Sequence, residues 1–222
     1  FWMWFTGLFG MATKFGEATL AVKYRVKAKD GSFIGGPMYA LERGLGQKWL
    51  GVLFAIFTGI ACFGIGNMTQ GNSIAESVSG TFGVPKVITG IILMIATGLV
   101  ILGGVKSISK VCEKLIPLMA GLYILGCLVI CVINGAYIPA AFSAIIRGAF
   151  NPQAVGGGFV GATVVACIRA GVSRGLFTNE SGLGSAPIVD ACAATRNPSR
   201  QALISMSGVF WDTIVVCLMT GL

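Results

Sequence analysis

The chain has 222 residues, of which 55% are hydrophobic and only 11% are charged. Soluble domains carry about a quarter charged residues, so this composition excludes an ordinary soluble domain and predicts an all-α polytopic membrane protein. The net charge of +8 does not indicate nucleic-acid binding, because the cations lie in a few short loops and no nucleic-acid motif accompanies them.

Six apolar stretches approach the roughly 20 residues that a helix needs to cross a bilayer. We expect them to form a single transmembrane domain over residues 1–222, with approximate spans 1–22, 49–75, 87–104, 115–134, 154–177 and 203–222. In the first span Lys14 and Glu17 are three residues apart and can pair on one helix face. A short amphipathic helix from Pro37 to about Arg43 is expected at the membrane interface. Both chain ends lie inside apolar runs, which predicts an internal fragment of a longer protein.

The loop cations predict the orientation of the spans. The loops after the first, third and fifth spans hold twelve Lys and Arg residues, whereas the loops after the second and fourth hold only Lys86 and Arg147. Cation-rich loops face the cytoplasm in membrane proteins. Spans one, three and five are therefore expected to run from outside to inside.

The second span carries a polar cluster, Gly64–Ser73, inside an apolar helix. Amides in a membrane helix cost free energy unless they face a cavity or bond across the bundle. Asn67 and Gln70 share one helix face, and so do Thr69 and Asn72. The cluster is either interhelical bonding or a substrate contact, and we expect Asn67 or Gln70 to touch substrate.

Glycines at both ends of the fifth span favour a broken helix over a continuous one. Gly156–Thr163 opens the span and Gly171 lies near its end. Unwound backbone offers N–H groups to a carboxylate and C=O groups to an ammonium or a cation. Arg169 is costly if it faces lipid, so we expect it to line the pathway or to pair with Asp212 or Glu17.

The segment Arg174–Pro187 combines three polar groups with residues that loosen a helix. Such a segment is what a gate between two access states requires. Glu180 either pairs with Arg174 as part of a cytoplasmic gate, or both are solvated at a helix end. Asn179 and Gly182 belong to the same candidate gate, and Pro187 favours a helix start.

Residues that enzymes and metal sites need are scarce. Histidine is absent, which removes the commonest general base and metal ligand, so an enzyme is the least expected class. The seven cysteines contain no CxxC pair and indicate neither a disulfide framework nor a metal site. No catalytic residue, cofactor or metal ligand is predicted.

Several motifs together resemble the sodium:alanine symporter family (alanine or glycine:cation symporters). The matching segments cover most of the chain: Phe1–Gly10, Met11–Arg25, Gly35–Tyr39, Gly66–Gln70 and Arg174–Pro187. The resemblance implies a leucine-transporter-type inverted-repeat fold of the APC superfamily, with about core helices two to seven in this chain. It also implies a multi-pass protein of a bacterial or archaeal plasma membrane.

The resemblance further implies sodium-coupled uptake of alanine or glycine. It assigns substrate contacts to Asn67, Thr69 and Gln70 on core helix three, and to Thr163, Gly171 and Ser173 on core helix six. Sodium is the expected coupling ion. Core helices one and eight, which would complete the ion site, are not in this chain, so we assign it no sodium ligand and expect it not to transport alone.

Other function classes stay open from the residues. An amino-acid facilitator or channel without ion coupling is the main alternative, and a structural membrane subunit, with the amides as interhelical bonds, is another. Alanine against glycine, D against L, sodium against proton and the oligomeric state are not fixed. The expected partners are a small amino acid, sodium and the lipid bilayer, without nucleic acid.

Overall fold

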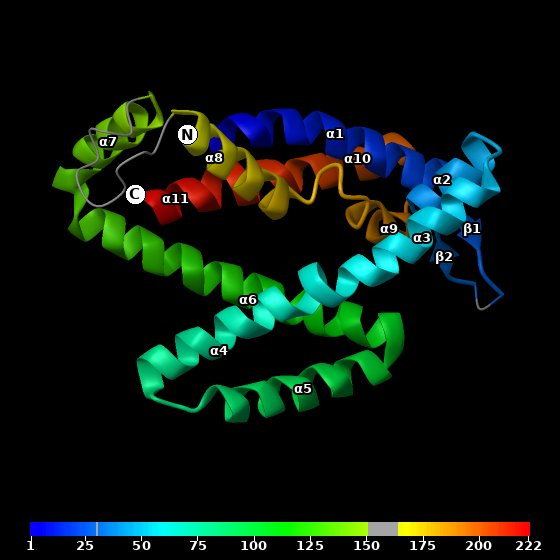
Figure 1. The fold of residues 1–222 in the computed structure, drawn as a ribbon, viewed down its shortest axis with the longest axis horizontal. Helices are drawn as coiled ribbons and strands as arrows, with labels where there is room; N and C mark the ends of the chain where they lie inside the picture. The colour runs from blue at the N-terminus through cyan, green and yellow to red at the C-terminus, as the bar shows by residue number, and fades with distance from the viewer. Residues whose placement is uncertain (30, 151–163) are drawn as a thin grey trace. The chain divides into compact units, whose positions relative to one another are not determined.

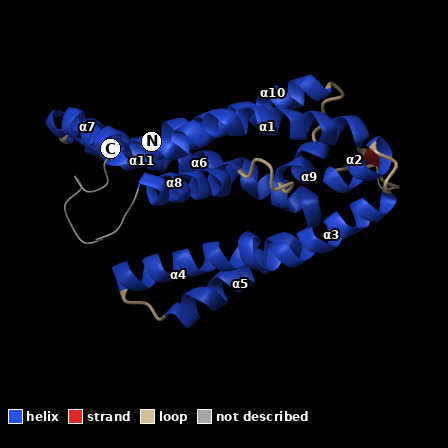
Figure 2. Ribbon diagram, turned by 45° about the horizontal axis from the view of Figure 1, so that its top comes forward, coloured by secondary structure: helices blue, strands red, loops and turns tan. Residues whose placement is uncertain are grey.

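The computed structural model describes residues 1–29, 31–150 and 164–222, and these are almost entirely helical (Figure 2). The prediction of a helical protein is therefore confirmed. The described strands are short: β1 (Val26–Lys27) pairs antiparallel with β2 (Phe33–Ile34).

The chain divides into two compact units. The first combines Phe1–Ala55 with Gly126–Leu222, and the second is Ile56–Leu125. Within the first unit, α1 (Trp2–Tyr24) packs against three later helices, α8, α9 and α10 (Figure 1). The later elements of this unit are η2 (Gly135–Tyr137), α7 (Ile138–Phe150), α8 (Val164–Asn179), α9 (Ala186–Ala191), α10 (Pro198–Val209), η4 (Phe210–Val216) and α11 (Cys217–Gly221).

Small residues allow α1 to approach its neighbours closely. A Cβ atom at Gly175 of α8 would lie 2.9 Å from the Cβ of Thr6, and one at Gly171 would lie 2.5 Å from the Cβ of Trp2. Ala18 and Ala202 are fully buried. Membrane helices usually associate through small residues. Lipid tails are as apolar as the side chains, so the hydrophobic effect does not drive association and close van der Waals packing does.

Arg25 links the end of α1 to the end of α9 and to the segment that follows it. Its guanidinium donates to the carbonyl oxygens of Ala191 at 3.0 Å and Thr195 at 2.6 Å, and it lies 3.8 Å from the centroid of the Phe33 ring. The strands then lead to α2 (Pro37–Gly44), the short amphipathic helix that the sequence predicts.

In the second unit α4 packs against α5. α3 (Lys48–Phe63) passes into this unit and continues through a π-helical turn, η1 (Gly64–Met68), into α4 (Thr69–Phe82). Gly83, in the left-handed conformation at φ +68°, ends α4 and leads to α5 (Lys86–Leu102).

The connection predicted at residues 105–114 is helical instead. α6 runs over Gly104–Ile133, because Lys110, Glu113 and Lys114 are good helix formers and extend the apolar span toward its N-terminus. The first part of the predicted 154–177 span, including the choice between a broken and a continuous helix at 156–163, lies outside the described residues.

Among the described residues, two helical stretches are long and apolar enough to cross a membrane, Ser107–Ile133 and Pro198–Gly221. Two shorter apolar helices, Lys48–Phe63 and Lys86–Leu102, accompany them. The described helices are consistent with a helical membrane protein.

Candidate functional site

The loop that follows α8, residues 179–185, is sharply bent. Glu180 has φ +51°, and Gly182 and Gly184 have φ +85° and +78°. The left-handed region suits glycine but is unfavourable for a residue with a side chain, by roughly 1–2 kcal/mol at Glu180. The 179–185 loop is therefore held in shape by its surroundings.

Asn179, the last residue of α8, is the buried anchor of this loop. It is 4% exposed, its carbonyl oxygen accepts from the Lys14 ammonium at 3.1 Å, and its side-chain oxygen accepts from the Thr213 hydroxyl of η4. A Cβ at Gly10 would come within 2.8 Å of the Asn179 amide nitrogen and 3.3 Å of the Ser181 hydroxyl. Glycine at position 10 thus lets the polar loop lie directly on α1.

Lys14 and Glu17 hold the loop rather than each other. A carboxylate oxygen of Glu17 accepts from the Gly182 N–H at 3.1 Å, while Lys14 bonds Asn179. In the part of the chain that the structure describes, no ion pair joins the two. The pairing that their spacing allows within α1 does not form. Lys14 instead reaches an unsatisfied carbonyl at the end of α8, and Glu17 reaches an N–H of the loop.

Glu180 does not pair with Arg174 among the described residues. Its carboxylate instead accepts from the Ser185 hydroxyl at 3.0 Å, one residue before α9 begins, and Arg174 is exposed on α8. The sequence leaves open either a Glu180–Arg174 pair or two solvated side chains. In the structure Arg174 is exposed, and Glu180 bonds within the loop.

A small cavity of about 200 Å³, lined largely by polar residues, lies beside the loop. Its charged lining groups are Lys14, Glu180 and Asp212, with Thr178, Asn179, Ser205, Gly208 and Val209 completing the wall. Arg169 is exposed on α8, and no described ion pair joins it to either predicted partner. The cavity brings two predicted gate residues next to Asp212.

The candidate substrate residues Asn67, Thr69 and Gln70 lie at the junction of η1 and α4 in the second unit. All three are exposed. A π-helical turn inside an α-helix is rare and often marks a functional position, because it widens the helix and turns side chains out of the usual register. The sequence predicts one uninterrupted span through this turn, and the glycines at 64 and 66 were the available signal.

The remaining candidates have different surroundings. Thr163 lies outside the described residues, Ser173 is exposed, and Gly171 packs on Trp2 of α1. The first unit therefore gathers Asn179, Glu180 and Gly182 in one loop, while Asn67, Thr69 and Gln70 belong to the second unit.

Sequence reasoning missed two buried polar residues near the loop. Thr213 is fully buried, and Asp190 of α9 is 8% exposed, with one carboxylate oxygen accepting from Gln201 at 2.8 Å and from Ser205. These bonds tie α9 to α10. An isolated acid among the small residues around Asp190 was the available signal.

Comparison with known proteins gives matches along the whole chain. Residues 1–222 match the model of the sodium:alanine symporter family. The chain is 55% identical over 226 residues to the sodium/alanine symporter AgcS of Methanococcus maripaludis. The aligned region covers 100% of this chain and 49% of AgcS. It is 54% identical over 223 residues to an uncharacterized transporter of Haemophilus influenzae, covering 100% and 49%.

A more distant relative is the probable sodium/glutamine symporter GlnT of Bacillus subtilis, 38% identical over 221 residues, covering 100% of this chain and 45% of GlnT. The chain spans about half the length of the curated relatives that it matches. The matching family consists of transporters rather than enzymes. Because its model matches from Phe1 to Leu222, the chain belongs to the sodium:alanine symporter family.

Proposed function

We propose that the protein containing this chain is a secondary active transporter that carries alanine or glycine into the cell together with sodium. The observation that carries the proposal is the 55% identity, over the full chain, to a relative named as a sodium/alanine symporter. Sodium is the coupling ion in this proposal, and no ligand for it is assigned to the described residues.

The proposed architecture is one transmembrane domain with an inverted-repeat fold in the plasma membrane. In it α1 is core helix two, α3 with α4 is core helix three, and α8 is core helix six, with α10 beginning core helix seven. The order of apolar helices and the alternation of loop cations support this assignment.

Substrate contacts are proposed for Asn67, Thr69 and Gln70, and for Thr163, Gly171 and Ser173. Exposed amides beside a π-helical turn in an apolar helix support the first group, since a small zwitterion needs hydrogen-bonding groups that lipid does not offer.

The proposed cytoplasmic gate comprises Arg174, Asn179, Glu180 and Gly182. Its closed form is held on α1 by Lys14 and Glu17, whose bonds end on Asn179 and Gly182. Opening this gate then requires the loop to leave α1 and the strained conformation of Glu180 to relax.

The test uses the full-length protein in liposomes. Uphill uptake of labelled alanine is expected with an inward sodium gradient and not with potassium or proton gradients. Gln70→Leu is expected to weaken apparent alanine affinity at least about tenfold, the factor that about 1.4 kcal/mol of lost binding gives. Gln47→Leu, outside the π turn, is the matched control. Uptake indifferent to every gradient would instead identify a facilitator or channel.

A further inference from the structure

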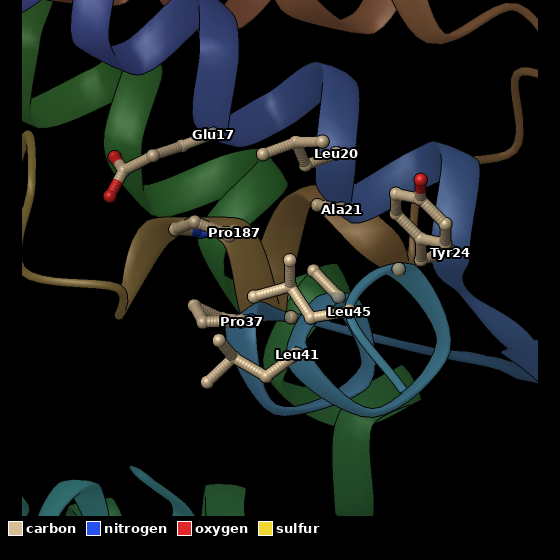
Figure 3. A pocket seen from close by; sticks show the side chains of 11 residues that line it. Glu17, Leu20, Ala21, Tyr24, Pro37, Leu41, Leu45 and Pro187 are labelled. Atoms are coloured by element: carbon tan, nitrogen blue, oxygen red, sulfur yellow. The ribbon is translucent and has the colours of Figure 1, made fainter. Parts of the chain in front are cut away.

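An apolar cavity of about 420 Å³ lies between α1 and α2 in the first unit, a volume typical of small-molecule sites. Its walls come from one face of α1, from α2 and the residue after it, and from Pro187 at the start of α9 (Figure 3). The side chains of Leu20, Leu41 and Leu45 line it, and Pro37 and Pro187 form one side.

The two polar side chains that line the cavity direct their polar ends away from its leucines. In Figure 3 the carboxylate of Glu17 points away from the leucines, and it is already used by the Gly182 N–H at 3.1 Å. The Tyr24 hydroxyl also points away from them, while its ring lies against Gly44, where a Cβ would come within 3.1 Å. An apolar cavity without polar partners does not hold ordered water and favours hydrocarbon.

Cations flank this cavity in the chain. Lys23 precedes the lining residue Tyr24 and lies 5.4 Å from the centroid of its ring, and Arg43 precedes the lining residue Gly44. Both are exposed, and no described ion pair involves either. α2 is short and amphipathic and carries Arg43 in its last turn, next to Glu42. Amphipathic helices of this kind lie at membrane interfaces, and the leaflet on the cytoplasmic side carries anionic lipid.

From these observations we propose that the cavity binds one acyl chain of an anionic phospholipid of the cytoplasmic leaflet, with its headgroup held by Lys23 and Arg43. The proposal rests on the proposed membrane location. Pro187 is the second residue of α9, two positions after the 179–185 loop, so a bound chain supports the start of the helix into which that loop leads. Occupancy therefore favours the closed position of the loop.

The experiment measures lipid retention, so it is independent of transport. Full-length protein in mild detergent is mixed with phosphatidylglycerol or phosphatidylcholine, and retained lipid is counted by native mass spectrometry. We expect preferential retention of phosphatidylglycerol. Lys23→Gln and Arg43→Gln should each weaken it about fivefold, the factor expected for one cation near an anionic surface.

Cavity filling gives the second arm. Leu41→Trp should remove one retained phosphatidylglycerol, whereas Leu122→Trp on the exposed face of α6 should not. Lys86→Gln and Arg147→Gln are the charge controls. If Leu41→Trp does not fold, the two charge variants still decide the outcome.

Two results would overturn the proposal. One is that both lipids are retained equally and that Lys23→Gln, Arg43→Gln and Leu41→Trp leave this retention unchanged. The other is absence of any retained lipid in the wild-type protein, which would mean that another part of the full-length chain fills the cavity. If the wild-type protein retains phosphatidylglycerol but takes up no alanine, the result contradicts the proposed transport function and not the proposed lipid site.

Discussion

In the first unit the polar groups of α1 are bonded to the 179–185 loop, whereas in the second unit the polar groups at the η1–α4 junction are exposed. Lys14, Glu17 and Thr213 each hold a partner in that loop. Asn67 and Gln70 lie on the surface of their own unit. The first arrangement fixes backbone, and the second leaves side chains able to meet a ligand or another helix.

Several glycines of the first unit lie in close contacts, and two glycines of α5 in the second unit do not. Gly10, Gly171 and Gly175 lie where a Cβ would press on a neighbouring helix or loop. Apart from their chain neighbours and the backbone of their own helix, no described atom lies within 4 Å of the Cβ position at Gly90 or Gly98 of α5. The same residue type thus serves close packing in one unit, while no such requirement exists for α5 in the other.

The largest expected effect comes from filling a helix contact. Gly175→Val should prevent stable folding or cost more than about 3 kcal/mol, because the new side chain meets the Thr6 side chain and the Met3 carbonyl. The measurement is thermal unfolding of the detergent-purified full-length protein. Gly90→Val is the control, and equal destabilisation by both changes would contradict the difference between the units.

A smaller effect is expected for the bonds that hold the loop on α1. Lys14→Met removes a charged donor from the Asn179 carbonyl and should cost about 1.5–3 kcal/mol of closed-loop stability. Alanine uptake by the full-length protein should change, with a lower unfolding temperature. Lys110→Met on exposed α6 is the control. Unchanged uptake and stability would show that the loop is held by other contacts.

The buried bond between η4 and the loop should contribute less. Thr213→Val keeps the shape but removes the hydroxyl that Asn179 accepts, at an expected ~0.6–2 kcal/mol for an interhelical hydrogen bond. Thr97→Val is matched to it, because the exposed Thr97 hydroxyl donates to Leu93 of its own helix and, among the described residues, to no other helix. A comparable fall in unfolding temperature for both variants would argue against the special position of Thr213.

The smallest effect is expected at the surface of the second unit. Glu76→Gln breaks the 3.0 Å ion pair with Lys86. The Glu76 side chain is 61% exposed and the Lys86 side chain 53%. Exposed pairs contribute about 0–1 kcal/mol, so unfolding temperature and uptake should barely change. A loss as large as that of Lys14→Met would mean that this pair is covered in the full-length protein.

Local sequence patterns predicted several elements well. The proline at position 37 and the amphipathic pattern after it gave α2, and Ser185–Pro187 gave the start of α9. These features depend on residues that are neighbours in the chain.

Long-range partners were not predictable in the same way. The spacing of Lys14 and Glu17 favoured a mutual pair, yet both bond residues about 165 positions away. Thr213 has no local feature that reveals its burial. Arg25 is one cation of a basic loop in the sequence, although it bonds carbonyl oxygens at the end of α9 and after it.

By itself the sequence determined the helical membrane class, the family and the positions of the polar clusters, because hydropathy, glycine placement and motif spacing are properties of the chain. Only the tertiary structure decided which of these polar groups are joined. The charged side chains of α1 can pair with one another, or they can bond the unpaired carbonyl and N–H groups of a neighbouring helix end and loop. The close approach permitted by Gly10 and Gly175 brings those ends within reach.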